Sequence, residues 1–256
     1  MDRGPKKAMR PRLDQLLVDR GICESREKAK RAILAGKVRI NDQVANKPGD
    51  LVNATDELTL AAPEKFVSRG GLKLEHGLEH FKVEVTGLRA VDLGASTGGF
   101  TDCLLQRGAS RVFAVDVGHG QLAWKLRQDD RVVVMEKTNA RELKPEHFPQ
   151  PFTPLDLAVV DCSFISLRKI IPSAVALLKV PARILALIKP QFEAGKQEAD
   201  RGAGVIKDPA IHERVLSELQ HFVAVQPGLR WSGVTESPIL GPAGNKEFLA
   251  LIEKSG

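Results

Sequence analysis

The sequence has few cysteines, and none is placed to bind a metal or to form a disulfide framework. Cys23, Cys103 and Cys162 lie far apart, and no CxxC pair occurs. The sequence also shows no group of His, Cys and carboxylate residues with the spacing of metal ligands, so no metal site is expected. The basic, polar N-terminus lacks the apolar core of a secretory signal. Together these absences favour a protein of the reducing cytoplasm.

A long uninterrupted apolar run is also missing. The most apolar stretch covers residues 170–188, but Lys179 and Arg183 interrupt it, as do two prolines. A membrane-spanning helix needs about 20 apolar residues with few charges. We therefore expect a helix that ends near Lys179, followed by a buried strand over residues 182–188, and no membrane span.

The acidic and basic residues are unevenly distributed between the two parts of the chain. Residues 1–49 contain 13 Lys and Arg against 6 Asp and Glu, whereas the formal net charge of all 256 residues is only +6. The whole basic excess therefore lies in about the first fifth of the chain. This asymmetry predicts a module that binds a polyanion, attached to a nearly neutral body.

The basic region is predicted to fold as a small α+β module. Apolar spacing indicates a short helix over residues 12–17 that Gly21 closes. Ser25 is a suitable N-cap for a second helix, which Gly36 ends. Short strands are expected at residues 38–40 and near Val44, Leu51–Val52 and residues 58–60, with a turn at Asn41-Asp42.

Exposed cations of this module are candidates for contacts with RNA phosphates, which position an RNA helix without reading its bases. Lys28, Lys30 and Arg31 lie together on the second helix. The full set of candidates is Arg12, Arg20, Lys28, Lys30, Arg31, Lys37 and Arg39.

Four short motifs in this region occur in the order seen in S4 domains. R-L-D, S-R-E-K-A, G-K-V and K-P-G follow one another between residues 11 and 60, which resemble an S4-type RNA-binding domain. One local departure is Asp42, where the family usually has glycine; Asp tolerates the left-handed conformation such a turn requires. The resemblance implies binding to structured RNA, commonly ribosomal. Residues 61–67 are the expected linker.

Beyond the linker, strands and helices alternate, which predicts an α/β domain over residues 68–256 with a mainly parallel, doubly wound sheet. Ligands of such sheets bind at the carboxyl ends of the strands. Asp208-Pro209 is expected to open a helix of about four turns. The predicted strands cover residues 90–93, 111–115, 131–135, 157–160, 182–188, 230–234 and 248–252.

A glycine-rich loop follows the first of these strands. In G-A-S-T-G-G, Ser96 replaces the second glycine of the dinucleotide-binding fingerprint, which is therefore incomplete. The longer sequence D-L-G-A-S-T-G-G-F instead resembles motif I of S-adenosylmethionine-dependent methyltransferases, the fold of which is Rossmann-like. Gly94 and Gly98 are expected to let the backbone approach the methionine part of the cofactor, and Asp116 to accept its ribose hydroxyls. The cofactor-binding candidates are Asp92, Gly94, Ala95, Ser96, Thr97, Gly98, Gly99, Phe100, Asp116, Asn139 and Asp161.

The remaining motifs narrow the class of methyltransferase. The sequence V-D-C-S-F after the fourth strand lacks the Pro-Pro of N6- and N4-methyltransferases. Cys162 lacks the neighbouring proline and the second cysteine of C5-cytosine enzymes. Charged residues stand instead at four strand ends or motif positions, and Lys73, Asp161, Lys189 and Glu247 resemble the tetrad of FtsJ-type ribose 2′-O-methyltransferases.

This tetrad suits a reaction in which a weakly acidic hydroxyl is deprotonated as it attacks a methyl group. Lys189, in a neutral form, is the expected base, and Lys73 is expected to orient the hydroxyl and stabilise developing negative charge. Asp161 and Glu247 would hold the ammonium groups in place. The scheme requires no metal.

An S4 domain ahead of an FtsJ-like domain resembles the TlyA (hemolysin A) family of rRNA methyltransferases. The motifs S-R-G-G-x-K-L, V-D-V-G-x-G-Q-L, V-D-x-S-F-I-S-L and I-K-P-Q-F-E carry this resemblance along nearly the whole chain. It implies S-adenosylmethionine-dependent 2′-O-methylation of cytidines in 16S rRNA, 23S rRNA or both, with the ribosome or its subunits as partner. One departure is Ala203, which separates consecutive glycines in the segment 196–208, a candidate substrate loop whose role the sequence leaves open.

Two other hypotheses stay open on the sequence alone. The chain could be a non-catalytic RNA-binding factor of ribosome assembly that keeps the fold, although its cofactor loop and tetrad are complete. The hemolysin label of the family suggests a membrane-lytic protein, but no secretory signal and no spanning or amphipathic membrane segment is found. The nucleotide, the ribosomal subunit and the oligomeric state are not encoded in any recognisable motif.

Overall fold

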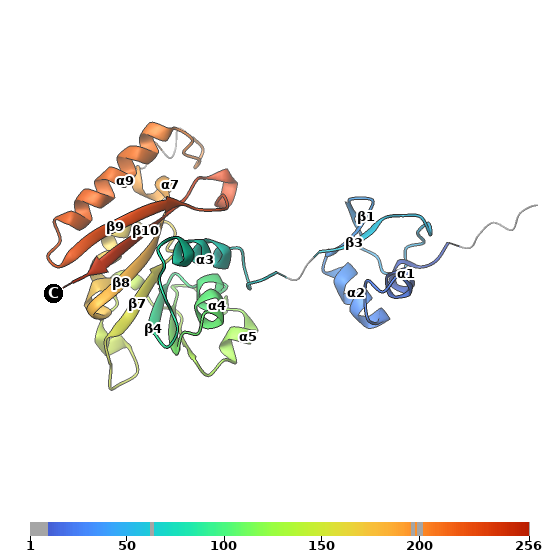
Figure 1. The fold of residues 1–256 in the computed structure, drawn as a ribbon, viewed down its shortest axis with the longest axis horizontal. Helices are drawn as coiled ribbons and strands as arrows, with labels where there is room; N and C mark the ends of the chain where they lie inside the picture. Colours follow the sequence, from blue (N-terminus) through green and yellow to red (C-terminus); the bar gives the residue numbers. More distant parts are fainter. Residues whose placement is uncertain (1–9, 62–63, 196–197, 199–201, 256) are drawn as a thin grey trace, which may run out of the picture. The chain divides into compact units, whose positions relative to one another are not determined.

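The computed structural model describes residues 10–61, 64–195, 198 and 202–255. The chain divides between Glu64 and Lys65 into two compact units (Figure 1). Phe66 is buried in the core of the second unit, and the Val67 amide donates to Asp102 Oδ2 at 2.8 Å. The last residues of the stretch expected to be a linker therefore pack as part of the second unit.

The first unit places two helices against a three-stranded antiparallel sheet of order β2-β1-β3. Leu13, Leu17 and Ile33 form its fully buried core. Ser25 Oγ accepts from the Lys28 amide and caps the second helix, as predicted. The elements are α1 (Leu13–Asp19), α2 (Arg26–Leu34), β1 (Val38–Ile40), β2 (Gln43–Val44) and β3 (Leu58–Leu60).

Two details of this unit test the expected strands and turns. Asn41 and Asp42 both adopt left-handed conformations, with φ of 48° and 67°, as the predicted two-residue turn requires. The strand expected at Leu51–Val52 is wrong, because Leu51 forms only an isolated bridge with Arg12. The segment runs past the entry to α1, where the Leu13 amide donates to Asp50 O, and this pairing is too short to extend the sheet.

The second unit is built on a seven-stranded sheet of order β6-β5-β4-β7-β8-β10-β9. The first five of these strands are parallel, and β10 runs antiparallel between β8 and β9. The carboxyl ends of β4, β7 and β8 are neighbours, so residues that follow these strands meet at one edge. The strands are β4 (Arg89–Leu93), β5 (Arg111–Val115), β6 (Val132–Met135), β7 (Leu155–Val160), β8 (Leu178–Ile188), β9 (Leu229–Glu236) and β10 (Phe248–Lys254).

Two hydrophobic clusters lie against this sheet, as expected where helices cover both faces of a parallel sheet. One contains Leu74 of α3 and Leu104 of α4, and the other contains Leu177 of α6 and Leu219 of α9. The α-helices are α3 (Gly70–His80), α4 (Gly99–Gln106), α5 (Trp124–Arg127), α6 (Ile171–Leu177), α7 (Pro190–Glu193) and α9 (Pro209–Ala224). The 3₁₀ turns are η1 (Ala140–Glu142), η2 (Pro145–His147), η3 (Leu167–Lys169) and η4 (Pro242–Gly244).

The apolar stretch at residues 170–188 forms a helix and then a strand, as predicted, but the junction lies earlier. Helix α6 ends at Leu177, and β8 begins at Leu178, where it pairs with Leu155. Lys179 lies 2.5 Å from Asp156 on the neighbouring strand, so its charge is balanced within the sheet. In the described part of the chain, no helix combines the length and apolarity that crossing a membrane requires.

Candidate active site

A loop between β4 and α4 begins the site. Gly94 and Gly98 have φ of 89° and 94°, a conformation that side chains disfavour. A Cβ on Gly94 would lie 2.9 Å from the Asp161 carbonyl oxygen, and one on Gly98 would lie 2.2 Å from a methyl of Leu126. The close neighbours of both glycines are therefore protein atoms. The two glycines therefore let the loop pack tightly against the rest of the protein. The sequence had predicted instead that they let the backbone approach the cofactor.

The carboxylate of Asp116, directly after β5, is held beside this loop. Its Oδ2 accepts from the Ser96 amide at 2.8 Å, and its Oδ1 accepts from the Gly118 amide at 2.7 Å. Each oxygen keeps a further lone pair for a ligand. Asp116 and Asn139 line a cavity of about 420 Å³, here called the Asp116 hollow, with Gly94, Ser96 and Phe164 on its walls.

Asp92 has a different position from the other cofactor candidates. It is fully buried and lines neither the Asp116 hollow nor the reaction cavity described below. Its Oδ2 accepts from the Thr101 amide at 2.9 Å and hydroxyl at 2.7 Å, which fixes the first turn of α4. Burial raises the pKa of this carboxyl to about 7. Asp92 therefore stabilises the loop through its hydrogen bonds to Thr101, and it is not placed to contact a cofactor in either cavity.

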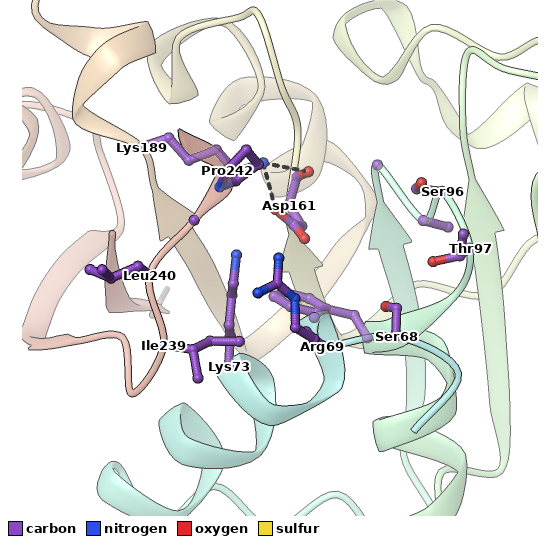
Figure 2. Close-up of a pocket in the computed structure, with 16 residues that line it drawn as sticks. Ser68, Arg69, Lys73, Ser96, Thr97, Asp161, Lys189, Ile239, Leu240 and Pro242 are labelled. Carbon is purple, nitrogen blue, oxygen red and sulfur yellow. Dashed lines mark hydrogen bonds and ion pairs between the residues drawn. The ribbon is translucent and has the colours of Figure 1, made fainter. Parts of the chain in front are cut away.

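A second cavity, here called the reaction cavity, adjoins the loop and contains three members of the predicted tetrad. It is lined by Ser68–Gly70, Lys73, Gly94–Thr97, Gly99, Phe100, Asp161, Lys189 and Ile239–Pro242. Most of the loop residues predicted to bind cofactor line it, whereas Gly98 does not. Figure 2 shows Lys73, Asp161 and Lys189 converging on it from separate segments of the chain.

The tetrad forms two ion pairs. Lys189 Nζ, at the start of α7, lies 2.7 Å from Asp161 Oδ1 and donates to Ser163 Oγ at 2.8 Å. Lys73 Nζ, on α3, lies 2.5 Å from Glu247 Oε2, just before β10. Both lysines are more than nine-tenths buried, and Glu247 is 1% exposed. Charges this deeply buried are costly unless paired, so their grouping around one cavity indicates a functional site.

Two buried carboxylate oxygens of the tetrad have no hydrogen-bond partner among the described residues. They are Glu247 Oε1 and Asp161 Oδ1. The Asp161 atom nevertheless lies 2.7 Å from Lys189 Nζ, so its negative charge is compensated by the ion pair. Unsatisfied buried acceptors are rare in folded proteins, so Glu247 Oε1 needs a structural explanation.

Sequence reasoning missed Arg69, which precedes α3 and lines the reaction cavity. Figure 2 shows its guanidinium beside the end of Lys73 and facing Asp161. Its position inside S-R-G-G, four residues before Lys73, was the available indication. A guanidinium here adds a fixed positive charge to the cavity and can bind an oxyanion through two donors.

A third cavity, here called the aromatic hollow, was also missed. Phe164 is 90% exposed, holds a φ of 63°, and its ring centre lies 4.9 Å from that of Phe192. Both rings line the hollow together with Arg141, Lys169, Lys189 and Glu247. An exposed aromatic pair beside cations suits a nucleotide, because bases stack on rings and phosphates pair with cations. No sequence pattern indicated that these two phenylalanines are outside the core.

Cys162 has none of the properties of a nucleophile. Its Sγ donates to Leu93 O at 3.3 Å, and burial raises the pKa of the thiol to about 12. The reactive thiolate is therefore negligible at neutral pH.

The predicted RNA-binding cations of the first unit fall into three groups. Arg12 pairs with buried Asp14 at 3.1 Å, Lys30 pairs with Glu27 at 2.9 Å, and Lys28 pairs with Glu24. Arg20 and Arg39 donate to backbone carbonyls of their own unit. Arg31 and Lys37 are exposed and make no ion pair or side-chain hydrogen bond with any described residue.

A parallel sheet with an antiparallel β10, a glycine loop after β4 and an acidic residue after β5 define a Rossmann-like methyltransferase. The profile of the FtsJ-like methyltransferase family matches residues 66–254, and that of the S4 domain matches residues 11–58. The chain belongs to the FtsJ-like methyltransferase family and carries an S4 domain ahead of it.

Individual relatives resemble the chain over most of its length. YqxC of Bacillus subtilis is 50% identical over 93% of this chain and 84% of its own. The 16S/23S rRNA (cytidine-2′-O)-methyltransferase TlyA of Mycobacterium tuberculosis is 48% identical over 94% of this chain and 89% of its own. A hemolysin-named protein of Streptococcus thermophilus has a solved structure that covers 96% of this chain and 89% of its own, with 45% identity and a TM-score of 0.73.

Proposed function

We propose that the protein transfers a methyl group from S-adenosylmethionine to the ribose 2′-hydroxyl of cytidines in 16S rRNA, 23S rRNA or both. The observation that carries the proposal is the pair of buried ion pairs, Lys189–Asp161 and Lys73–Glu247, around a cavity next to the glycine loop. The M. tuberculosis relative, 48% identical to this chain, is named for this activity.

The residues beside the glycine loop suit S-adenosylmethionine. Asp116 keeps carboxylate lone pairs for the cofactor's ribose hydroxyls, and Asn139 lines the same hollow. Gly94 and Ser96 line both this hollow and the reaction cavity, so the loop would hold the methionine part. The bound cofactor supplies an activated methyl group on a positively charged sulfur.

The tetrad would hold and deprotonate the attacking hydroxyl. Lys189 accepts the hydroxyl proton at Nζ, for which it must be in its neutral form. Lys73, fixed by Glu247, donates to the hydroxyl oxygen and stabilises its developing negative charge. With these residues in place, the cofactor would supply its methyl group to the hydroxyl oxygen and would itself be released as a neutral thioether.

The substrate would approach through the aromatic hollow, which shares Lys189 with the reaction cavity. An extruded base can stack on Phe164, and Arg141 and Lys169 can pair with flanking phosphates. In the S4 domain, Arg31 and Lys37 are the predicted cations that remain available for RNA phosphates.

Mapping of ribose methylation tests this proposal. Bacterial rRNA prepared with and without the active protein should differ at discrete cytidines that resist alkaline cleavage only when the protein is present. Identical patterns, or methyl groups found on bases, would contradict the proposed reaction.

A further inference from the structure

The backbone conformation at Gly241 does not require a glycine. It lies before η4 in the segment between β9 and β10, with φ of −72° and ψ of −175°, an extended conformation open to any residue. Its Cα packs directly on a tetrad carboxylate. A Cβ at this position would lie 2.0 Å from Glu247 Oε1 and 2.5 Å from Glu247 Cδ. The need for glycine is therefore set by Glu247.

The carboxylate of Glu247 is held between two groups. Its Oε2 pairs with Lys73 at 2.5 Å, and its Oε1, which has no hydrogen-bond partner among the described residues, faces Gly241. Among the described residues, no donor therefore fixes Glu247 Oε1. Its contact with the backbone of Gly241 limits how far the carboxylate can move from Lys73. Only a residue without a side chain leaves this space.

The backbone around Gly241 is anchored, so a clash would move Glu247 and not the loop. The Gly241 amide donates to Asn245 O at 2.8 Å. Buried Asn245 in turn donates to Gly204 O at 2.9 Å and accepts from the Ile206 amide at 2.9 Å. By contrast, Glu247 Oε1 is the end of a side chain with rotatable bonds.

We propose that Gly241 is a positioning residue of the methyltransferase site: its missing side chain seats Glu247 against Lys73. Through that ion pair, Gly241 sets where the Lys73 ammonium stands in the reaction cavity, without donating to or accepting from the substrate. The catalytic consequence rests on the proposed function, in which Lys73 orients the 2′-hydroxyl. The structural claim is that a side chain at residue 241 and the Glu247 carboxylate would compete for the same space. This claim does not depend on the proposed function.

The structural claim is tested by a thermal-stability cycle on the full-length protein. Gly241→Ala should lower Tm when Lys73 and Glu247 are present. The same substitution should leave Tm unchanged in a Lys73→Met/Glu247→Ala background, which removes the obstructing carboxylate without leaving one buried charge unpaired. Equal losses of Tm in both backgrounds would overturn the proposal, because the methyl group would then clash with something other than Glu247.

The catalytic consequence is tested by kinetics of Gly241→Ala. We expect kcat to fall roughly 10- to 100-fold, as for a catalytic group displaced by about 1 Å. KM for rRNA and the calorimetric Kd for S-adenosylmethionine should not change. Lys246→Ala, at an exposed residue of the same loop that pairs with Glu236, is the matched control and should keep its kcat. A raised KM or Kd with unchanged kcat would mean that the methyl group blocks a ligand. If methylation were not on ribose, the Tm cycle would still decide the role of Gly241.

Discussion

Lys189 Nζ lies 2.7 Å from Asp161 Oδ1, and the two residues directly follow β8 and β7, which pair side by side in the sheet. The parallel register therefore brings together two charges that are 28 residues apart in the chain. Because both stand at the carboxyl edge of the sheet, the fold itself places an amine next to the ligand cavity.

Asp116 should be the main anchor of the cofactor's ribose. Asp116→Ala should weaken S-adenosylmethionine binding by at least ~2 kcal/mol, because a buried hydroxyl pair loses a charged acceptor. Part of that loss will come from the Ser96 and Gly118 amides, which also lose their acceptor. Isothermal calorimetry measures the effect, with Asp129→Ala, a surface carboxylate paired to Arg131, as the control. Unchanged affinity would remove Asp116 from the cofactor site.

The S4 domain should bind RNA through those cations that have no partner among the described residues. Replacing Arg31 and Lys37 with alanine should reduce the salt dependence of rRNA binding, by up to ~0.9 in the log–log slope for each RNA phosphate that is no longer neutralised. The matched pair Lys28→Ala and Lys30→Ala, whose ammonium groups already pair with Glu24 and Glu27, should change the slope less. Filter binding over a range of salt concentrations measures both. If both double substitutions changed the slope equally, ion pairing within the S4 domain would not determine which cations bind RNA.

Cys162 should be dispensable for methyl transfer. Burial raises the pKa of its thiol to about 12, so the group stays protonated and unreactive across the working range of pH. Cys162→Ser should keep kcat for methyl transfer to rRNA near that of the unmodified protein. Abolition of activity in a variant that folds and binds cofactor would instead indicate a covalent attack on cytosine C5.

Asp92 should make folding stability depend on pH. Its folded-state pKa of about 7 exceeds the ordinary aspartate value of 3.8, so between these values the folded state binds more protons than the unfolded state. Its contribution to the free energy of unfolding therefore decreases as pH rises from about 4 to about 7. Asp92→Asn keeps an acceptor for Thr101 and removes the buried charge. Denaturant titrations should show the variant gaining stability relative to the unmodified protein over that range. A difference that is constant with pH would contradict this assignment.

The sequence predicted most of the sheet, because buried parallel strands are continuous apolar runs and their ends carry the charged motif residues. It also singled out Lys73, Asp161, Lys189 and Glu247, since each lies in a recognisable motif. The structure brings these side chains together as two ion pairs, and their catalytic roles stay a prediction. The sequence could not predict which lysine pairs with which carboxylate: Lys73 and Glu247 are 174 residues apart, and only the fold brings them together. The exposure of Phe164 could not be predicted either, because a positive φ that turns a ring toward solvent leaves no trace in a hydrophobicity pattern. The strand at residues 51–52 was overpredicted, because a short apolar pair can also form a single bridge to a neighbouring segment.

Nucleoside analysis of rRNA methylated in vitro by purified protein tests the central claim most directly. With the unmodified protein, the methyl group should appear as 2′-O-methylcytidine. Lys189→Ala should bind cofactor and rRNA nearly as well but lose methyl transfer by roughly 100-fold or more, because the proton acceptor is gone. Lys189→Arg should fail as well, since a guanidinium does not release its proton at working pH. A methyl group on the base, or full activity of Lys189→Ala, would contradict the account.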